Sequence, residues 1–158
     1  GELCVRPVKE VYQLKKKRLL VLKNVSAEEA DRQLQKYSGN CLWMKVCADA
    51  KRIILDTIDG SRKKTVYYDR ENCRFGWIDE KGIPQGRYRG PEDNVNIGSG
   101  LVNMEYFLDH SMIEVYLNDK KSITLRNYIQ GRERRIGIAG EAAKILELEL
   151  WEMDSAYK

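Results

Sequence analysis

The chain has 158 residues, of which 42% are hydrophobic and 33% charged; this balance favours one globular domain with a core and excludes a disordered chain. The net charge is +4, and the basic residues gather in short, separate clusters at 15–18, 86–89 and 131–135, which is weak support for nucleic-acid binding. No apolar run approaches the roughly 20 residues that cross a bilayer. We therefore expect neither nucleic acid nor membrane as a partner.

The cysteines do not form a metal-binding pattern. Cys4, Cys41, Cys47 and Cys73 contain no C-x-x-C pair, and the only histidine, His110, is distant from all of them in sequence. This spacing predicts no metal site and no cofactor. Free, mostly buried thiols favour a reducing compartment, so we expect a cytoplasmic location and leave secretion open.

One helix and many strands are expected in chain order. Ser26 is a candidate helix N-cap with Glu29 three residues on, the spacing of a capping box, and predicts a short helix near residues 26–36. The other periodic segments predict strands at residues 18–25, 41–48, 52–57, 65–69, 73–79, 101–109, 112–118, 122–129, 135–140 and 143–153.

The strand pattern indicates sheets with one buried and one outer face. In residues 41–48 the side chains of Leu42, Met44, Val46 and Ala48 share one face. In residues 143–153, Leu146, Leu148 and Leu150 alternate with Glu147 and Glu149. Residues 58–63 read as a turn, and the glycine- and proline-rich residues 80–100 as a long loop. The fold class expected is all-β, a two-sheet antiparallel β-sandwich of jelly-roll or lectin-like type.

Asp109, His110 and Ser111 have the residue types of a nucleophilic triad. Three consecutive residues in a tight turn cannot easily align a nucleophile, a base and an orienting acid. The more plausible interpretation is a turn between two strands, in which the Asp and Ser side chains accept backbone N–H groups.

The next hairpin can be aligned by its inward residues. Leu117 is expected to oppose Ile123, because paired strands must present the same face to the core. That alignment leaves residues 119–121 as the loop and places Glu114 opposite Arg126 on the outer face, where the two would form a cross-strand ion pair.

Asp109 and Glu114 were also considered as a glycosidase carboxylate pair. Five residues of extended chain cover roughly 16 Å, and an odd offset sends the side chains to opposite faces, although the turn would shorten the distance. We expect no catalytic pair here, and no catalytic residue anywhere in the chain.

The segment from residue 109 to 128 resembles the D-x-S-x-x-E-V-[FY]-x-N signature near the end of glycoside hydrolase family 32 proteins, which include invertases, levanases, inulinases and sucrose-6-phosphate hydrolases. The matching residues are Asp109, Ser111, Glu114, Val115, Tyr116 and Asn118. Weaker similarities follow in the right order, at Pro7, Val8, Glu10 and Leu14, at residues 64–79, and in the final strand.

The resemblance implies a C-terminal β-sandwich beside an N-terminal five-bladed propeller that hydrolyses β-fructofuranosides with retention. Residues 1–14 would then be a connector and first strand, and residues 15–158 a single sandwich domain. The hallmark propeller segments W-M-N-D-P-N-G, R-D-P and E-C do not occur here, so no catalytic residue is carried over. Residues 78–82 also depart from the D-R-S segment of many relatives.

The function expected is a non-catalytic module of a β-fructofuranosidase-type enzyme, which stabilises the catalytic domain; the resemblance also leaves room for a homodimer. The alternative is an independent carbohydrate-binding module for fructose-containing sugars. Trp43, Trp77 and Trp151 are the candidate sugar-stacking or interdomain residues for these two functions.

Overall fold

The computed structural model describes residues 7, 9–126 and 133–154. Within these residues the structure has twelve strands, one α-helix and one 3-10 helix. In chain order the elements are η1 Lys9–Leu14, β1 Lys15–Ser26, α1 Ala27–Leu34, β2 Cys41–Asp49, β3 Arg52–Asp59, β4 Arg62–Asp69, β5 Arg74–Ile78, β6 Pro84–Gln85, β7 Asp93–Asn94, β8 Val102–Asp109, β9 Met112–Leu117, β10 Lys121–Arg126, β11 Arg135–Glu141 and β12 Lys144–Met153. No helix in this described part has the length and apolarity needed to cross a membrane.

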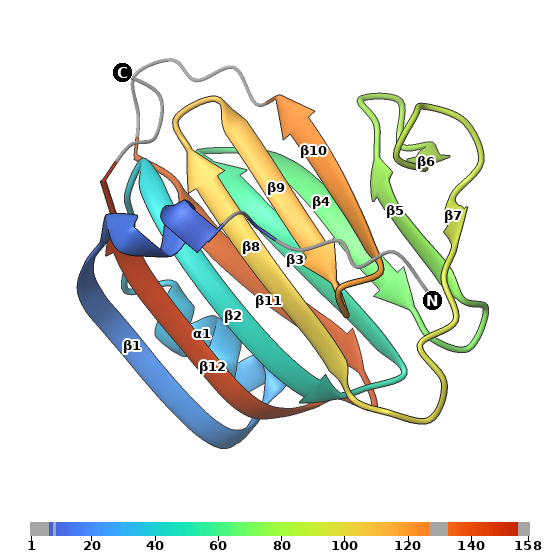
Figure 1. The fold of residues 1–158 in the computed structure, drawn as a ribbon, viewed down its shortest axis with the longest axis horizontal. Helices are drawn as coiled ribbons and strands as arrows, with labels where there is room; N and C mark the ends of the chain where they lie inside the picture. The colour runs from blue at the N-terminus through green and yellow to red at the C-terminus, as the bar shows by residue number, and fades with distance from the viewer. Residues whose placement is uncertain (1–6, 8, 127–132, 155–158) are drawn as a thin grey trace.

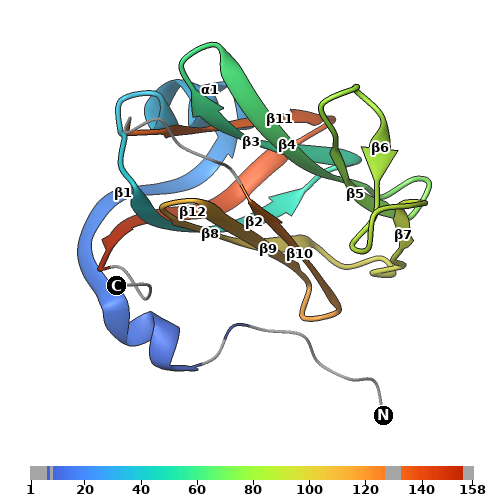
Figure 2. The ribbon, with the colours of Figure 1, turned by 90° about the horizontal axis from the view of Figure 1, so that it is seen from above.

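The strands form two antiparallel sheets, as predicted. The first sheet has the order β1-β12-β2-β8-β9-β10, and the second has the order β11-β3-β4-β5-β6, with β7 also paired to β5. Figure 1 looks onto the first sheet, and Figure 2 shows the two layers edge-on, with η1 lying against the outer face of the first. The prediction of an all-β sandwich with one short helix is confirmed.

The core lies between the sheets and follows the period-two pattern of the sequence. Leu42, Met44, Val46 and Ala48 of β2 are all at most 2% exposed and belong to the core, as predicted. Strand β12 differs. A register shift between Ile145 and Glu147 marks a β-bulge, so Ile145 is buried and Leu146 is only half-buried. The extra residue of a bulge interrupts the alternation, which is why the predicted inward position of Leu146 was wrong.

Helix α1 covers the open side of the sandwich between β1 and β11 (Figure 2). Its first turn is capped by Ser26, whose hydroxyl accepts a hydrogen bond from the Glu29 N–H at 3.1 Å, as the capping-box spacing predicted. On its inner side, Asp31 accepts a hydrogen bond from the backbone N–H of Ile138 at 2.9 Å. The helix thereby satisfies part of the free edge of β11.

The predicted register of the β9–β10 hairpin is wrong by two residues. Leu117 lies opposite Lys121, and Glu114 lies opposite Thr124. Arg126 lies opposite Met112, so the expected direct pairing of Glu114 with Arg126 does not form. A slip of two residues keeps every side chain on its own face, and the inside–outside pattern therefore cannot detect it.

Three smaller expectations also need correction. The turn between β3 and β4 contains only residues 60 and 61, because both strands extend further than predicted. The loop at residues 80–100 includes the short strands β6 and β7, which pair with β5. The three described cysteines are free, but they are half-buried rather than buried. Residues 127–129 of the predicted strand 122–129, and Cys4, lie outside the described residues.

Candidate functional site

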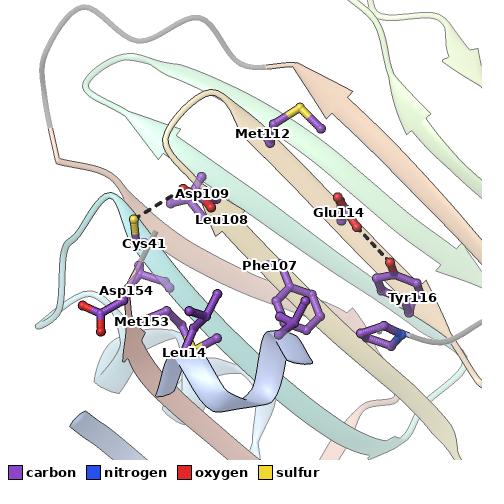
Figure 3. Close-up of a pocket in the computed structure, with 13 residues that line it drawn as sticks. Leu14, Cys41, Phe107, Leu108, Asp109, Met112, Glu114, Tyr116, Met153 and Asp154 are labelled. Carbon is purple, nitrogen blue, oxygen red and sulfur yellow. Dashed lines mark hydrogen bonds between the residues drawn. The ribbon is translucent and has the colours of Figure 1, made fainter. Parts of the chain in front are cut away.

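A cavity of about 290 Å³ opens on the outer face of the first sheet, between η1 and strands β2, β8 and β9 (Figure 3). Its walls are mainly apolar, with three carboxylates among them. The lining residues are Pro7, Val11, Leu14, Cys41, Leu42, Phe107, Leu108, Asp109, Met112, Glu114, Tyr116, Met153 and Asp154.

Three residues of the family motif lie together in this cavity. Asp109 is the last residue of β8, and Glu114 and Tyr116 point outward from β9 (Figure 3). The Tyr116 hydroxyl donates a hydrogen bond to Glu114 at 2.8 Å. The expectation that an odd offset separates Asp109 from Glu114 was wrong, because the hairpin reverses the chain. Asp109 pairs with Met112, so Glu114 is its diagonal neighbour on the same face.

Two further motif residues, Ser111 and Asn118, lie at opposite ends of β9. Ser111 is in the two-residue turn between β8 and β9, as predicted for that segment. Asn118 follows β9 at a φ of 45°. Its amide accepts a hydrogen bond from the backbone N–H of Asn103 at 2.7 Å and donates one to the carbonyl of Leu101 at 2.9 Å. Asn118 therefore fixes the hairpin end against β8 and does not contact the cavity.

An aromatic row crosses the same sheet face beside the cavity; its members are Tyr12, Trp43, Phe107 and Tyr116. Neighbouring ring centroids lie 5.9 to 6.3 Å apart, within the range of favourable aromatic pairs. Glu105 joins the row, because it accepts hydrogen bonds from the Tyr12 hydroxyl at 2.8 Å and from the Trp43 indole N–H at 3.1 Å. The row attaches η1 to the sheet.

The Lys15 ammonium group lies 4.0 Å from the ring centroid of Trp43 and 5.0 Å from that of Trp151. Lysine at this distance from an indole face makes a cation–π contact. Within the basic cluster at residues 15–18, Lys15 therefore packs against two tryptophan rings. Neither Glu105 nor Lys15 could be recognised as a site residue beforehand, since both look like ordinary surface charges on a strand.

The predicted tryptophans fall into two groups. Trp43 is 3% exposed and Trp77 is 5% exposed, and Trp77 belongs to the core, where its indole N–H donates to the Gly86 carbonyl at 2.9 Å. Neither offers a free ring face to a sugar. Trp151 is half-buried, and its indole N–H donates to Glu149 at 2.8 Å.

Arg134 is a buried cation behind the first sheet. It is 0% exposed, and none of its three guanidinium nitrogens has a hydrogen-bond partner among the described residues. Burial lowers the pKa of Arg134, because the charged form loses its hydration. Tyr106 is fully buried as well and shares a 2.5 Å hydrogen bond with Thr57. Burial raises the pKa of Tyr106 far enough to keep it neutral.

A group of metal-ligand types lies at the rim of the cavity. The Cys41 sulfur is 3.6 Å from Asp109 Oδ1 and 3.7 Å from His110 Nε2. One ligand atom from each of the three residues lies within 4.8 Å of the other two. The prediction of no metal site relied on the distance between His110 and the cysteines in sequence. Because Cys41 of β2 pairs with Asp109 of β8, the next residue, His110, lies close to Cys41 in the folded chain.

Several solved structures have a similar fold. Sucrose-6-phosphate hydrolase from Lactobacillus gasseri matches with a TM-score of 0.65 at 19% identity, over 98% of this chain and 32% of that one. A β-fructofuranosidase from Bombyx mori gives 0.61 at 13% identity, over 96% and 30%. Fructan 1-exohydrolase IIa from Cichorium intybus gives 0.61 at 13% identity, over 96% and 38%.

The chain therefore spans about a third of the length of these proteins. At such identities the likeness concerns the fold alone. No curated protein sequence gave a match. The family model described as "Glycosyl hydrolases family 32 C terminal" matches residues 24–152, which is most of the chain. The match includes every described strand of both sheets except the last residue of β12 and the first part of β1. The protein belongs to this family of glycosyl hydrolase C-terminal domains.

Proposed function

We propose that the chain is the non-catalytic β-sandwich module of a β-fructofuranosidase-type glycoside hydrolase, and that it stabilises an N-terminal catalytic propeller in the same polypeptide. The observation that carries this proposal is the family match over residues 24–152. The similar structures support it. Their names describe a sucrose-6-phosphate hydrolase, a fructan exohydrolase and a β-fructofuranosidase, and this chain corresponds to about a third of each.

The geometry of the outer sheet face is consistent with a supporting role. Each polar group of the motif that faces the cavity has a neighbour within the module: Glu114 with Tyr116, and Asp109 with Cys41. The aromatic row is packed and bonded to Glu105 rather than open. These contacts pair the polar and aromatic side chains of this face with one another, which is consistent with a surface that packs against a neighbouring domain.

The first experiment measures hydrolysis by the purified 158-residue chain. Sucrose, sucrose-6-phosphate and inulin are incubated with it, and released fructose is quantified. We expect no release above the buffer blank. Release that is lost in an Asp109→Asn or a Glu114→Gln variant would contradict the proposal, because these two carboxylates share one face of the sheet.

The second experiment tests the stabilising role in the parent enzyme. The coding sequence upstream of Gly1 should encode a propeller with the W-M-N-D-P-N-G segment. The full polypeptide is compared with a version that ends before residue 15, by thermal unfolding and by sucrose hydrolysis. We expect the shortened enzyme to unfold at a lower temperature. Equal unfolding temperatures and equal activity would refute a stabilising role.

A carbohydrate-binding module is the second candidate, and Trp151 is the tryptophan that favours it, because part of its ring is exposed. Isothermal titration of the chain with inulin and with sucrose separates the two functions. Saturable binding that is lost in Trp151→Ala would favour the binding module, and a flat titration favours the supporting role.

A further inference from the structure

Cysteine, aspartate and histidine side chains converge at the end of the first sheet, outside the aromatic row. They come from two neighbouring strands: Cys41 opens β2, Asp109 closes β8, and His110 begins the turn that follows. Cys41 and Asp109 are half-buried, and His110 is exposed. Figure 3 shows Cys41 and Asp109 pointing toward each other.

The strand pairing explains why these side chains meet. Cys41 and Asp109 are direct partners in the register of β2 and β8. The backbone N–H of His110 donates to the carbonyl of Asn40 at 2.8 Å, one residue outside the pair on each strand. This pattern identifies Cys41 and Asp109 as a non-hydrogen-bonded pair, in which the side chains approach most closely. The same bond holds the backbone of His110 against β2, at a φ of 51°.

We propose that Cys41, Asp109 and His110 bind one zinc(II) ion, with a water molecule as the fourth ligand. In a tetrahedral site, Zn–S bonds of about 2.3 Å and Zn–N or Zn–O bonds of about 2.0–2.1 Å put the sulfur about 3.5 Å from each of the other two ligand atoms. The corresponding distances here are 3.6 and 3.7 Å. The ligand atoms of Asp109 and His110 lie within 4.8 Å of each other, so they must move closer to reach the tetrahedral distance, and His110 is exposed.

The ligand set selects the class of metal. Thiolate and imidazole prefer zinc and its transition-metal neighbours, whereas magnesium and calcium prefer oxygen ligands throughout. A thiolate and a carboxylate together supply two negative charges, which match the charge of a divalent ion. Three protein ligands leave one coordination position open.

Metal binding is measured on the metal-free 158-residue chain. Zinc chloride is titrated by calorimetry, and cobalt(II) is added in parallel, since a cobalt–thiolate bond gives a charge-transfer absorption that a carboxylate or imidazole alone does not. We expect one equivalent of metal to bind and the charge-transfer band to saturate at the same ratio. The absence of saturable binding, or of the thiolate band, would overturn the proposal.

Three variants identify the ligands. Cys41→Ser, Asp109→Asn and His110→Asn each remove one donor with little change in shape, and asparagine tolerates the positive φ at position 110. We expect each to weaken zinc binding by at least about 100-fold, more than the 10- to 100-fold loss typical of a residue that only orients a ligand. Circular dichroism checks that each variant keeps the fold.

The matched control is Cys47→Ser, on the same strand and the same face as Cys41. It should leave both the stoichiometry and the affinity unchanged. If Cys47→Ser abolishes the cobalt band while Cys41→Ser preserves it, the metal binds elsewhere and the proposed site is wrong. If all three ligand variants bind zinc as tightly as the original chain, the contact of Cys41 with Asp109 is only a hydrogen bond.

Discussion

Replacing Arg134 with methionine is expected to stabilise the protein. Arg134 is 0% exposed, and within the part of the chain that the structure describes its Nε, Nη1 and Nη2 atoms lack hydrogen-bond partners. An unsatisfied buried polar group costs about 1–3 kcal/mol, and a charged one more. Methionine keeps the unbranched stem in place and removes the charge. The backbone is unaffected, because the N–H and C=O of Arg134 bond to Gly39 at 3.0 and 2.9 Å in either variant.

We therefore expect Arg134→Met to raise the free energy of unfolding by about 1–3 kcal/mol, which for a chain of this size corresponds to roughly 2–4 °C in Tm for each kcal/mol. Urea unfolding followed by tryptophan fluorescence measures the free energy, and an unchanged m value shows that the two curves are comparable. The control is Arg135→Met, at an exposed position of β11, which should change stability by less than about 0.5 kcal/mol. A loss of more than about 1 kcal/mol in Arg134→Met, with the control unchanged, would refute the reasoning, because it would mean that the guanidinium is satisfied in solution.

Three further substitutions test other parts of the structure. Ser26→Ala removes the N-cap of α1 and should lower the free energy of unfolding by about 1 kcal/mol, measured by urea unfolding. Asn118→Ala removes two hydrogen bonds and puts alanine, which tolerates positive φ less well than asparagine, at this position, so we expect a loss of about 1–3 kcal/mol. Asn118→Gly removes the same hydrogen bonds but relieves the backbone, so it should recover part of the loss; a glycine variant less stable than the alanine variant would contradict this account. Asp79 accepts a hydrogen bond from the backbone N–H of Ile83 and another from the Gln85 side chain, and the first of these chiefly lowers the pKa of Asp79. The pKa of Asp79 in the folded protein lies below the unfolded value of about 3.9, so Asp79 contributes to the free energy of unfolding above that pH, and this contribution is lost as the pH falls through the folded pKa. Asp79→Asn should therefore be less stable than the original chain at pH 7 and equally stable in strong acid. Thermal unfolding at several pH values measures the difference.

The sequence was most informative about which face of a strand is buried. The alternation in β2 predicted four core residues correctly, because a sandwich buries one face of each strand and the period of two is strict there. The capping residues also predicted the start of α1, since that interaction is local and needs no information from the rest of the fold.

The hydrophobic alternation was least informative about the register between paired strands. A shift of two residues between β9 and β10 leaves the burial of Leu117 and Ile123 unchanged, and the loop geometry at Asn118 decided the register instead. The bulge in β12 likewise depends on packing against two neighbours, which the alternation of Leu146 and Glu147 does not encode.

The candidate site could be predicted only in part. The motif singled out Asp109, Glu114 and Tyr116, but the expectation that Asp109 and Glu114 lie on opposite faces was wrong, because the hairpin brings both to the cavity. The cavity and the group around Cys41 depend on the pairing of β2 with β8 and on the position of η1. These contacts join segments far apart in the chain, and no local pattern specifies them.

The position of β1 has one more consequence. It is the outermost strand of the first sheet, and an exposed strand edge can accept a strand from another molecule and seed aggregates. Residues 15–18 place four consecutive positive charges on this edge, and register shifts between Lys15 and Lys17 and between Arg18 and Leu20 distort it. Neutralising Lys16 and Lys17 should leave the fold intact and make the protein less soluble on storage.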